Sequence, residues 1–249
     1  MYLHAPTVNF IAPTDQDTLT VEQGGTFDLP EDGGPWQVPR SLEQSQLIAR
    51  MRHMPHRLKD YGYEVSTGPL VWNRHKDQRA DKPSKSAFPL IWAESVTADG
   101  RFQFRADKKN HAPYFKTKEG DDWLITRKPC VLLQRTTAKE QSRRLIAAEL
   151  PVTFLQKHKA VVIENHINMI RPCVESPAVS ATVMAGLLNS AIVDAAFRCI
   201  SGSVAVSAYE LENLPLPSPA DLKRVLGRKT SREAIAKAAQ LLYTQDGEE

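Results

Sequence analysis

Only three cysteines occur among the 249 residues, and Cys130, Cys173 and Cys199 lie far apart. Because the chain has no CxxC spacing, the sequence excludes a disulfide framework and a zinc ribbon, and it fits a reducing compartment. No apolar run approaches the roughly 18 residues of a membrane-spanning helix. Residues 1–6 do not show the basic-then-apolar order of a signal peptide. We therefore expect a cytoplasmic protein with no membrane partner.

The motifs of the common catalytic classes are also missing. The sequence has no glycine-rich phosphate loop, no GxSxG motif, no S-adenosylmethionine loop and no Asn/Asp-Pro-Pro-aromatic tetrad. His53 and His56 lie three residues apart, but no carboxylate or cysteine completes a metal-binding set around them. We therefore predict no catalytic residue, no metal site and no cofactor bound by this chain.

Positive charge is almost absent from the first fifth of the chain and concentrated in the middle. Residues 1–49 contain one Lys/Arg and seven Asp/Glu, residues 50–144 contain 21 and 11, and residues 145–249 contain 10 and 11. The basic block over 50–144 indicates a face for a polyanion, although a solvated charged surface would produce the same excess. We expect the acidic first segment to pack away from that face.

The hydrophobic content of 41% and the charged content of 24% are typical of a globular protein. We predict an α+β fold, in which an irregular acidic arm or linker over 1–40 precedes one β-rich domain over 41–249. Short strands are plausible in the arm at 7–11 and 18–23. A helix is expected after Ser41, which has the spacing of a capping box with Gln44.

The rest of the chain alternates between short apolar runs and basic loops. The pattern predicts strands at 70–72, 88–92, 101–105, 123–126, 131–134 and 161–164. It predicts helical segments at 138–149, at 180–200 with a break near Asn189, and at 220–243. Long basic loops at 73–86 and 106–122 connect the strands, and loops of this length are usually functional or mobile.

Three segments place polar and cationic side chains directly after a short apolar run. Asparagine can read adenine, arginine can fork onto guanine, and lysine and hydroxyl groups can bind phosphate oxygens. The candidate residues in these segments are Asn73, Arg74, His75, Lys76, Gln134, Arg135, Thr136, Thr137, Lys139, Arg143, Asn165 and His166. Each segment could instead be a strand end whose polar groups meet water, but three in one chain favour recognition.

A fourth segment, from Ser201 to Ser203, surrounds a glycine and precedes the apolar pair Val204 and Val206. We interpret it as a tight loop that brings backbone close to a partner such as a phosphate. A plain structural turn fits the same pattern equally well.

These segments resemble a known family. The matching stretches are STGPLVWNRHKDQ (66–78), PCVLLQRTTAKEQ (129–141), VIENHINMIRP (162–172), LLNS (187–190) and FRCISGSVAVSAYELENLPLPSP (197–219). They are similar to the C-terminal region of adenine-N6 DNA modification methylases, with the XhoI type of bacterial restriction-modification system as the nearest group. More distantly, the layout resembles the TaqI-like specificity domain. The resemblance covers the chain from about residue 8 to residue 226.

The resemblance implies that the chain is a target-recognition region that grips double-stranded DNA and selects a site. In such enzymes an N-terminal domain binds S-adenosylmethionine and methylates a flipped-out adenine. Because its motifs are missing here, the resemblance implies a catalytic methyltransferase domain or subunit as partner, and a cognate restriction endonuclease that shares the DNA site without necessarily contacting the chain. Two alternatives stay open: a split-methylase subunit that is active only with a catalytic chain, and an inactive remnant.

Overall fold

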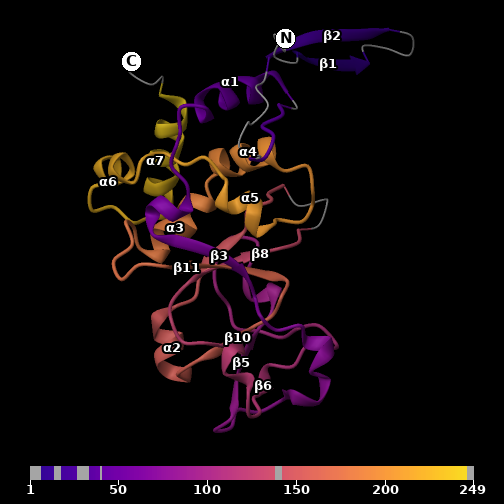
Figure 1. Cartoon of the computed structure of the whole chain (residues 1–249), viewed down its shortest axis with the longest axis vertical. Helices are drawn as coiled ribbons and strands as arrows, with labels where there is room; N and C mark the ends of the chain where they lie inside the picture. The colour runs from indigo at the N-terminus through magenta and orange to yellow at the C-terminus, as the bar shows by residue number, and fades with distance from the viewer. Residues whose placement is uncertain (1–6, 14–17, 27–33, 40, 138–141, 246–249) are drawn as a thin grey trace.

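The computed structural model is an α+β fold, and it describes residues 7–13, 18–26, 34–39, 41–137 and 142–245. A four-stranded antiparallel sheet lies at its centre (Figure 1). In order across the sheet, the strands are β3 (Tyr63–Thr67), β11 (Ile167–Pro172), β8 (Val131–Gln134) and β9 (Ala147–Glu149).

Both faces of this central sheet are buried. Val131 and Leu133 of β8 belong to one core cluster, whereas Leu132 between them belongs to another. Successive side chains on a strand point to opposite faces, so the sheet separates the two clusters. This arrangement explains why β8 is a continuous apolar run instead of an alternating one.

Helices cover one face of the central sheet (Figure 1). Gly186 allows two of them, α3 (Ala181–Leu188) and α7 (Arg232–Thr244), to approach closely, because a Cβ at this position would lie 2.6 Å from Cδ1 of Ile235. The tyrosine hydroxyls in this core are satisfied: Tyr61 donates to the Pro217 carbonyl at 2.8 Å and Tyr243 to the Pro215 carbonyl at 2.6 Å. The helices of this half are α1 (Leu42–Met51), α3 (Ala181–Leu188), α4 (Ala191–Ile200), α5 (Ala208–Glu212), α6 (Pro219–Leu226) and α7 (Arg232–Thr244).

A second sheet of five short strands lies beyond the other face of the central sheet (Figure 1). Only the pairing of its strands β5 and β10 is parallel. Val161 and Ile163 of β10 face the cluster between the sheets, and Val162 faces a smaller cluster that includes Trp92 and Phe115. In order, the strands are β4 (Arg79–Ala80), β6 (Tyr114–Lys116), β5 (Ala87–Ile91), β10 (Val161–Ile163) and β7 (Ile125–Thr126).

Short helical segments join the strands of this half. Helix α2 (Val152–His158) packs Leu155 and Phe154 against the cluster between the sheets. The remaining segments are 3-10 turns: η1 (Leu58–Tyr61), η2 (Trp72–Arg74), η3 (Lys76–Gln78), η4 (Ala93–Ser95) and η5 (Asp121–Leu124).

The acidic arm contains an antiparallel hairpin of β1 (Thr7–Pro13) and β2 (Leu19–Thr26), in which Ile11 pairs with Val21. In Figure 1 the hairpin lies at the end of the molecule opposite the five-stranded sheet. The two short strands predicted in the arm are therefore confirmed. Most of the carboxylates of the acidic segment lie outside the described residues, so its expected packing away from the basic face stays a prediction.

No single helix among the described residues is long and apolar enough to cross a membrane. Together, α3 and α4 have the length and apolar composition of a membrane span, but the pair bends by 67° at the break between the helices. Most of its apolar side chains belong to the core cluster beneath the helices.

Several predicted elements are confirmed. Strands lie at or near 88–92, 131–134 and 161–164, the break at Asn189 separates α3 from α4, and α6 and α7 cover the predicted C-terminal helical segment. Ser41 caps α1 by accepting a hydrogen bond from the Gln44 N–H at 3.3 Å.

Other predicted elements are wrong. The helical segment expected at 138–149 contains strand β9, because Ala147–Glu149 pairs with β8. The region 101–105 forms no strand; its one β-bridge joins Phe102 to Val96, and Phe102 packs against Phe154 of α2. Within 123–126 only β7 is a strand, and 70–72 contains a single bridge from Leu70 to Glu164. The basic loop at 73–86 contains parts of η2, all of η3 and β4.

Candidate functional site

Two of the polar segments predicted from the sequence meet where the two sheets join, and the residues just before the remaining one reach the same point. The backbone N–H of Arg135 donates to the His166 carbonyl at 2.9 Å, and its guanidinium Nη1 donates to the Asn165 carbonyl at 3.3 Å. The N–H of Asn165 donates in turn to the Leu70 carbonyl at 3.0 Å, just before the Asn73 segment. We call this meeting point of residues 68–70, 135–137 and 164–166 the junction.

The Ser201–Ser203 loop leads into the same junction. Thr136 forms a β-bridge with Ala205, and the N–H of Val206 donates to the Arg135 carbonyl at 2.7 Å. The Ser203 hydroxyl accepts the Ala205 N–H at 3.0 Å, while Ser201 is buried. The fourth predicted segment is therefore next to the second one in space, with the exposed hydroxyl of Ser203 at the turn.

A buried carboxylate holds the third segment in place. Glu164 is only 1% exposed, and its carboxylate accepts the His166 backbone N–H at 2.9 Å and lies 2.7 Å from His166 Nδ1. The His166 ring remains 59% exposed. Gly68 lies against the Glu164 backbone so closely that a Cβ would be 2.3 Å from the carbonyl oxygen. The exposed imidazole is thus oriented by groups beneath it.

Three predicted residues of the second segment are engaged within the chain. Gln134 donates from Nε2 to the carbonyls of Ala93 and Val96, the latter at 2.6 Å. Thr137 is 2% exposed, and Arg143 donates to the side-chain oxygen of Asn189 at 3.0 Å. The Gln134 contacts tie β8 to the turn η4, and the Arg143 contact ties the segment before β9 to the end of α3.

The first predicted segment lies beside the five-stranded sheet, on η2 and η3. Asn73, Arg74 and Lys76 are exposed, whereas the His75 ring is half-buried. His75 Nδ1 lies 2.9 Å from Oε1 of Gln78, and its ring packs edge-on against Phe115 at 5.8 Å. The structure connects this segment to the junction through Leu70 along the chain. Lys139, predicted for the second segment, lies outside the described residues.

A polar network anchors the first segment to the following turn. Gln78 is buried and donates from Nε2 to Oδ2 of Asp121 at 2.5 Å and to the Lys116 carbonyl at 3.0 Å. Lys118 Nζ lies 2.5 Å from Oδ2 of Asp77, and this hydrogen bond is the main reason why the pKa of the Asp77 carboxyl is lowered. The cationic segment is therefore held by side-chain hydrogen bonds as well as by its backbone.

The sequence pattern does not single out Glu164 or Gln78, although both position predicted residues. For Glu164 a signal exists, since a carboxylate stands two residues before His166 at the end of an apolar run. For Gln78 there is none, because its partners Lys116 and Asp121 are about forty residues away and only the fold brings them close.

The thiol beside β8 is not set up as a nucleophile. Cys130 immediately precedes β8 and is fully buried, and this burial raises its thiol pKa to about 12. A thiol in that state is not a nucleophile at neutral pH. Among the described residues no group of three or more His, Cys, Asp or Glu side chains is placed to hold a metal ion.

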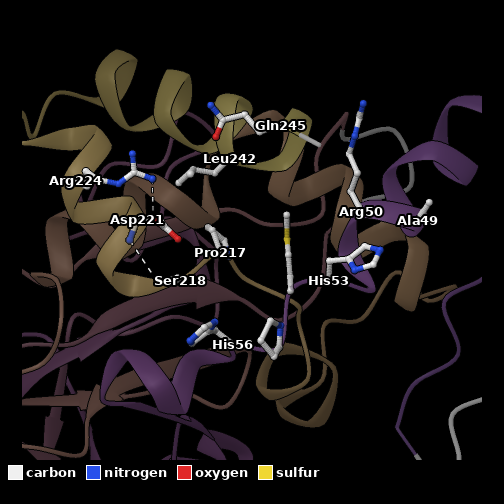
Figure 2. Close-up of a pocket in the computed structure, with 12 residues that line it drawn as sticks. Ala49, Arg50, His53, His56, Pro217, Ser218, Asp221, Arg224, Leu242 and Gln245 are labelled. Carbon is white, nitrogen blue, oxygen red and sulfur yellow. Dashed lines mark hydrogen bonds and ion pairs between the residues drawn. The ribbon is translucent and has the colours of Figure 1, made fainter. Parts of the chain in front are cut away.

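A large cavity lies elsewhere, between the C-terminal end of α1 and the helices α6 and α7 (Figure 2). Its volume is about 870 Å³, and it is lined by Arg50, His53, His56, Asp221 and Arg224 among others. Arg224 pairs with Asp221 at 2.8 Å, and this hydrogen bond is the main cause of the lowered pKa of the Asp221 carboxyl. None of the thirteen predicted residues that the structure describes lines this cavity.

The chain is similar in sequence to type II methyltransferases. It is 28% identical over 181 residues to the type II methyltransferase M.BsuBI of Bacillus subtilis, a match that covers 72% of this chain and 35% of that protein. It is 24% identical over 186 residues to M.PstI of Providencia stuartii, covering 74% of this chain and 36% of that protein. The chain thus spans about a third of the length of the curated relatives it matches. No protein-family model matches it.

Solved structures with partial likeness come from type I restriction-modification proteins. A chain from a study of the complex assembly and conformational transition of the type I R-M system is 13% identical, with a TM-score of 0.39 over 81% of this chain and 47% of that one. The HsdS subunit from Thermoanaerobacter tengcongensis is 14% identical, with a TM-score of 0.35 over 80% of this chain and 44% of that one.

Proposed function

We propose that this chain is the target-recognition part of a site-specific DNA methyltransferase of a restriction-modification system. In this proposal the chain binds double-stranded DNA and selects the site. The enzyme to which it belongs methylates the N6 atom of adenine. The similarity to two type II methyltransferases over about three quarters of the chain is the observation that carries the proposal. We also propose that the chain is related to the recognition region of the XhoI type and, more distantly, to the TaqI-like specificity domain.

The charge distribution supports DNA as the ligand. Residues 50–144 hold ten more Lys/Arg than Asp/Glu, and the exposed Arg74 and Lys76 lie within this block. Phosphate contacts fix the register of a protein on the duplex, and a few side chains then read the base edges. We assign base reading to Asn73 and Arg74, and phosphate contact to Lys76, Thr136 and Lys139.

The junction supports a rigid mounting for these contacts. Arg135, His166 and Ser203 sit on backbone segments that are hydrogen-bonded to one another. A side chain positioned in advance loses less conformational freedom on binding than one on a free loop. We therefore assign these residues to a second strip of DNA contact, with Asn165 beside it.

Methyl transfer is assigned to a partner. A catalytic methyltransferase domain or subunit would bind S-adenosylmethionine and receive the flipped adenine, while this chain holds the flanking duplex in the cytoplasm. No step of the transfer is assigned to residues of this chain. The two curated relatives are about three times as long as the matched part, which favours this division of labour.

Salt dependence of duplex binding tests the proposal. For a labelled duplex of mixed sequence, we expect the logarithm of the association constant to fall with log salt at a slope of roughly −4 to −7, as for about 5–8 phosphate contacts. A well-folded protein that binds no duplex at any salt concentration would overturn the proposal and leave an inactive remnant.

Selection from a pool of duplexes with a randomised core tests the assigned roles. Arg74→Ala should relax the sequence preference, whereas Lys139→Ala should weaken binding to all sequences alike. Arg228→Ala, an exposed cation between α6 and α7, is the control and should change neither. Equal losses on selected and random duplexes for Arg74→Ala would remove Arg74 from the base-reading residues.

A further inference from the structure

One large apolar side chain stands out on the basic part of the surface. Trp123 is 64% exposed, and among the described residues of the basic block 50–144 no other large hydrophobic side chain is exposed. Exposed aromatic rings are costly in water, and they are enriched at sites of molecular contact.

The turn that carries Trp123 is held on both sides. Leu124, the next residue, is fully buried, and Ile125 pairs with Val162 of the five-stranded sheet. On the other side the Asp121 carboxylate accepts the Lys118 backbone N–H at 2.8 Å and the Gln78 side chain at 2.5 Å. The indole therefore projects from a backbone that its neighbours fix, as a preorganised contact requires.

The same hydrogen bonds place Trp123 next to the first predicted recognition segment. Gln78 and Asp77 belong to η3, which begins at Lys76, and they contact Asp121 and Lys118 respectively. Side-chain hydrogen bonds therefore join the turn that carries Trp123 to the 3-10 turn that follows Arg74. Further cations, Arg127 and Lys128, follow Trp123 closely in the sequence.

We propose that Trp123 is a DNA-contacting residue whose indole ring packs on a nucleobase, beside the phosphate contacts made by the surrounding cations. This inference rests on the proposed function. It adds a residue that contacts DNA through its ring and does not distinguish bases by hydrogen bonds. Asp121 and Asp122 precede the ring, and Arg127 pairs with Asp122 at 3.8 Å, but the basic block 50–144 as a whole holds ten more Lys/Arg than Asp/Glu and favours a polyanion over a protein partner. In duplex DNA the ring would pack on a base that is partly unstacked from its neighbour, as inserted apolar side chains do.

Trp36 provides a matched control. It is 59% exposed, close to the value for Trp123, but it lies within the acidic first segment, residues 1–49, where the chain is net negative. Trp72 and Trp92 are covered more deeply and pack edge to face with ring centroids 6.0 Å apart. Fluorescence can therefore be assigned to the exposed rings by replacing Trp36 and Trp123 in turn with phenylalanine.

The experiment measures binding of the whole chain to the labelled duplex for wild type, Trp123→Ala, Trp123→Phe and Trp36→Ala. We expect Trp123→Ala to weaken binding about 5- to 150-fold, the range for loss of one base–aromatic stack. The slope of affinity with salt should not change, because an indole neutralises no phosphate. Trp123→Phe should retain part of the affinity, and Trp36→Ala should equal wild type. Quenching of tryptophan fluorescence by DNA should persist in Trp36→Phe and disappear in Trp123→Phe.

Two results would overturn the inference while leaving the proposed function intact. The first is a wild type that binds duplex with the expected salt slope, together with a Trp123→Ala variant of equal affinity. The second is a Trp123→Ala variant that binds DNA weakly and unfolds at a lower temperature, but regains the full wild-type affinity at a temperature where it is folded. The loss would then come from unfolding and not from a missing DNA contact. Absence of duplex binding by the wild type would instead overturn both proposals.

Discussion

In the helical half of the molecule, side chains from α1, α3, α4 and α7 fill one large apolar cluster, whereas around β4, β5 and β6 the apolar cluster is small. The second region gains its order from polar contacts, such as Gln78 to Asp121 and Lys118 to Asp77. Burial of apolar area stabilises a fold. A region that exposes many cationic side chains has less apolar area to bury, so it gains less stability in this way. We infer that the helical half supplies stability and the five-stranded half supplies a charged surface of fixed shape.

The largest expected effect lies in the helical core. Phe197 of α4 is fully buried, and Phe197→Ala should lower the free energy of unfolding by about 3–5 kcal/mol through lost burial and a new cavity. Urea denaturation followed by circular dichroism measures this change. Leu241→Ala on α7 is the control, because Leu241 is 42% exposed and its truncation leaves no buried cavity. Similar losses in both variants would contradict the assignment of stability to this core.

A change at the junction should affect both halves together. A Cβ at Gly68 would lie 2.3 Å from the Glu164 carbonyl oxygen, and backbone cannot yield as a flexible side chain does. Gly68→Ala should therefore cost about 1–3 kcal/mol, the usual range for overpacking. Hydrogen exchange should show faster exchange in β10 and in β11. Faster exchange confined to one of these strands would mean that the junction does not couple the sheets.

A smaller effect is expected in the polar network. Gln78→Ala removes the hydrogen bonds to Asp121 and Lys116 and should cost about 1–2 kcal/mol, since each such bond contributes modestly in net terms. The exposed Gln103 provides the control, and Gln103→Ala should leave the unfolding midpoint unchanged. A neutral Gln78→Ala would show that the five-stranded half does not depend on this network.

The smallest effect is a pH dependence near α2. Burial, and secondarily the charge of Lys157, lowers the pKa of His158 below its usual 6.5. The folded chain therefore binds this proton less readily than the unfolded chain, so stability should fall as the pH drops below about 6.5 and should be unaffected above it. Urea midpoints of wild type and His158→Gln between neutral and mildly acidic pH measure this difference. A gap between the two proteins that stays constant with pH would contradict it.

The success of sequence-based prediction differs between the same two regions. The helices α3, α4, α6 and α7 follow from apolar spacing and from breaks such as Asn189, because helical hydrogen bonds join residues close in the sequence. Strand β9 was not predictable in this way: Ala147–Glu149 has no strand propensity of its own, and only pairing with β8 makes it a strand. Residues 101–105 show the converse. Their polar and apolar side chains alternate as in a strand, but they form only an isolated bridge to Val96 and therefore no strand.

For the candidate site, the sequence identified the segments but not their supports. The convergence of residues 135, 165 and 166 follows from strand pairing, which no local pattern predicts. Trp123 was assigned to a strand from its neighbours, although it lies on the turn η5 with its ring exposed. The sequence therefore predicts where polar groups concentrate, and the fold decides which of them are free to meet a partner.

The two-sided burial of β8 has a consequence for how the chain can vary. A shift of β8 by one residue relative to its neighbours would exchange the contents of the two cores, because alternate side chains face opposite ways. Such a slip would also turn Gln134 away from the carbonyls of Ala93 and Val96. The surface near the proposed reading residues can thus tolerate substitution, while the register of β8 is constrained by both core clusters.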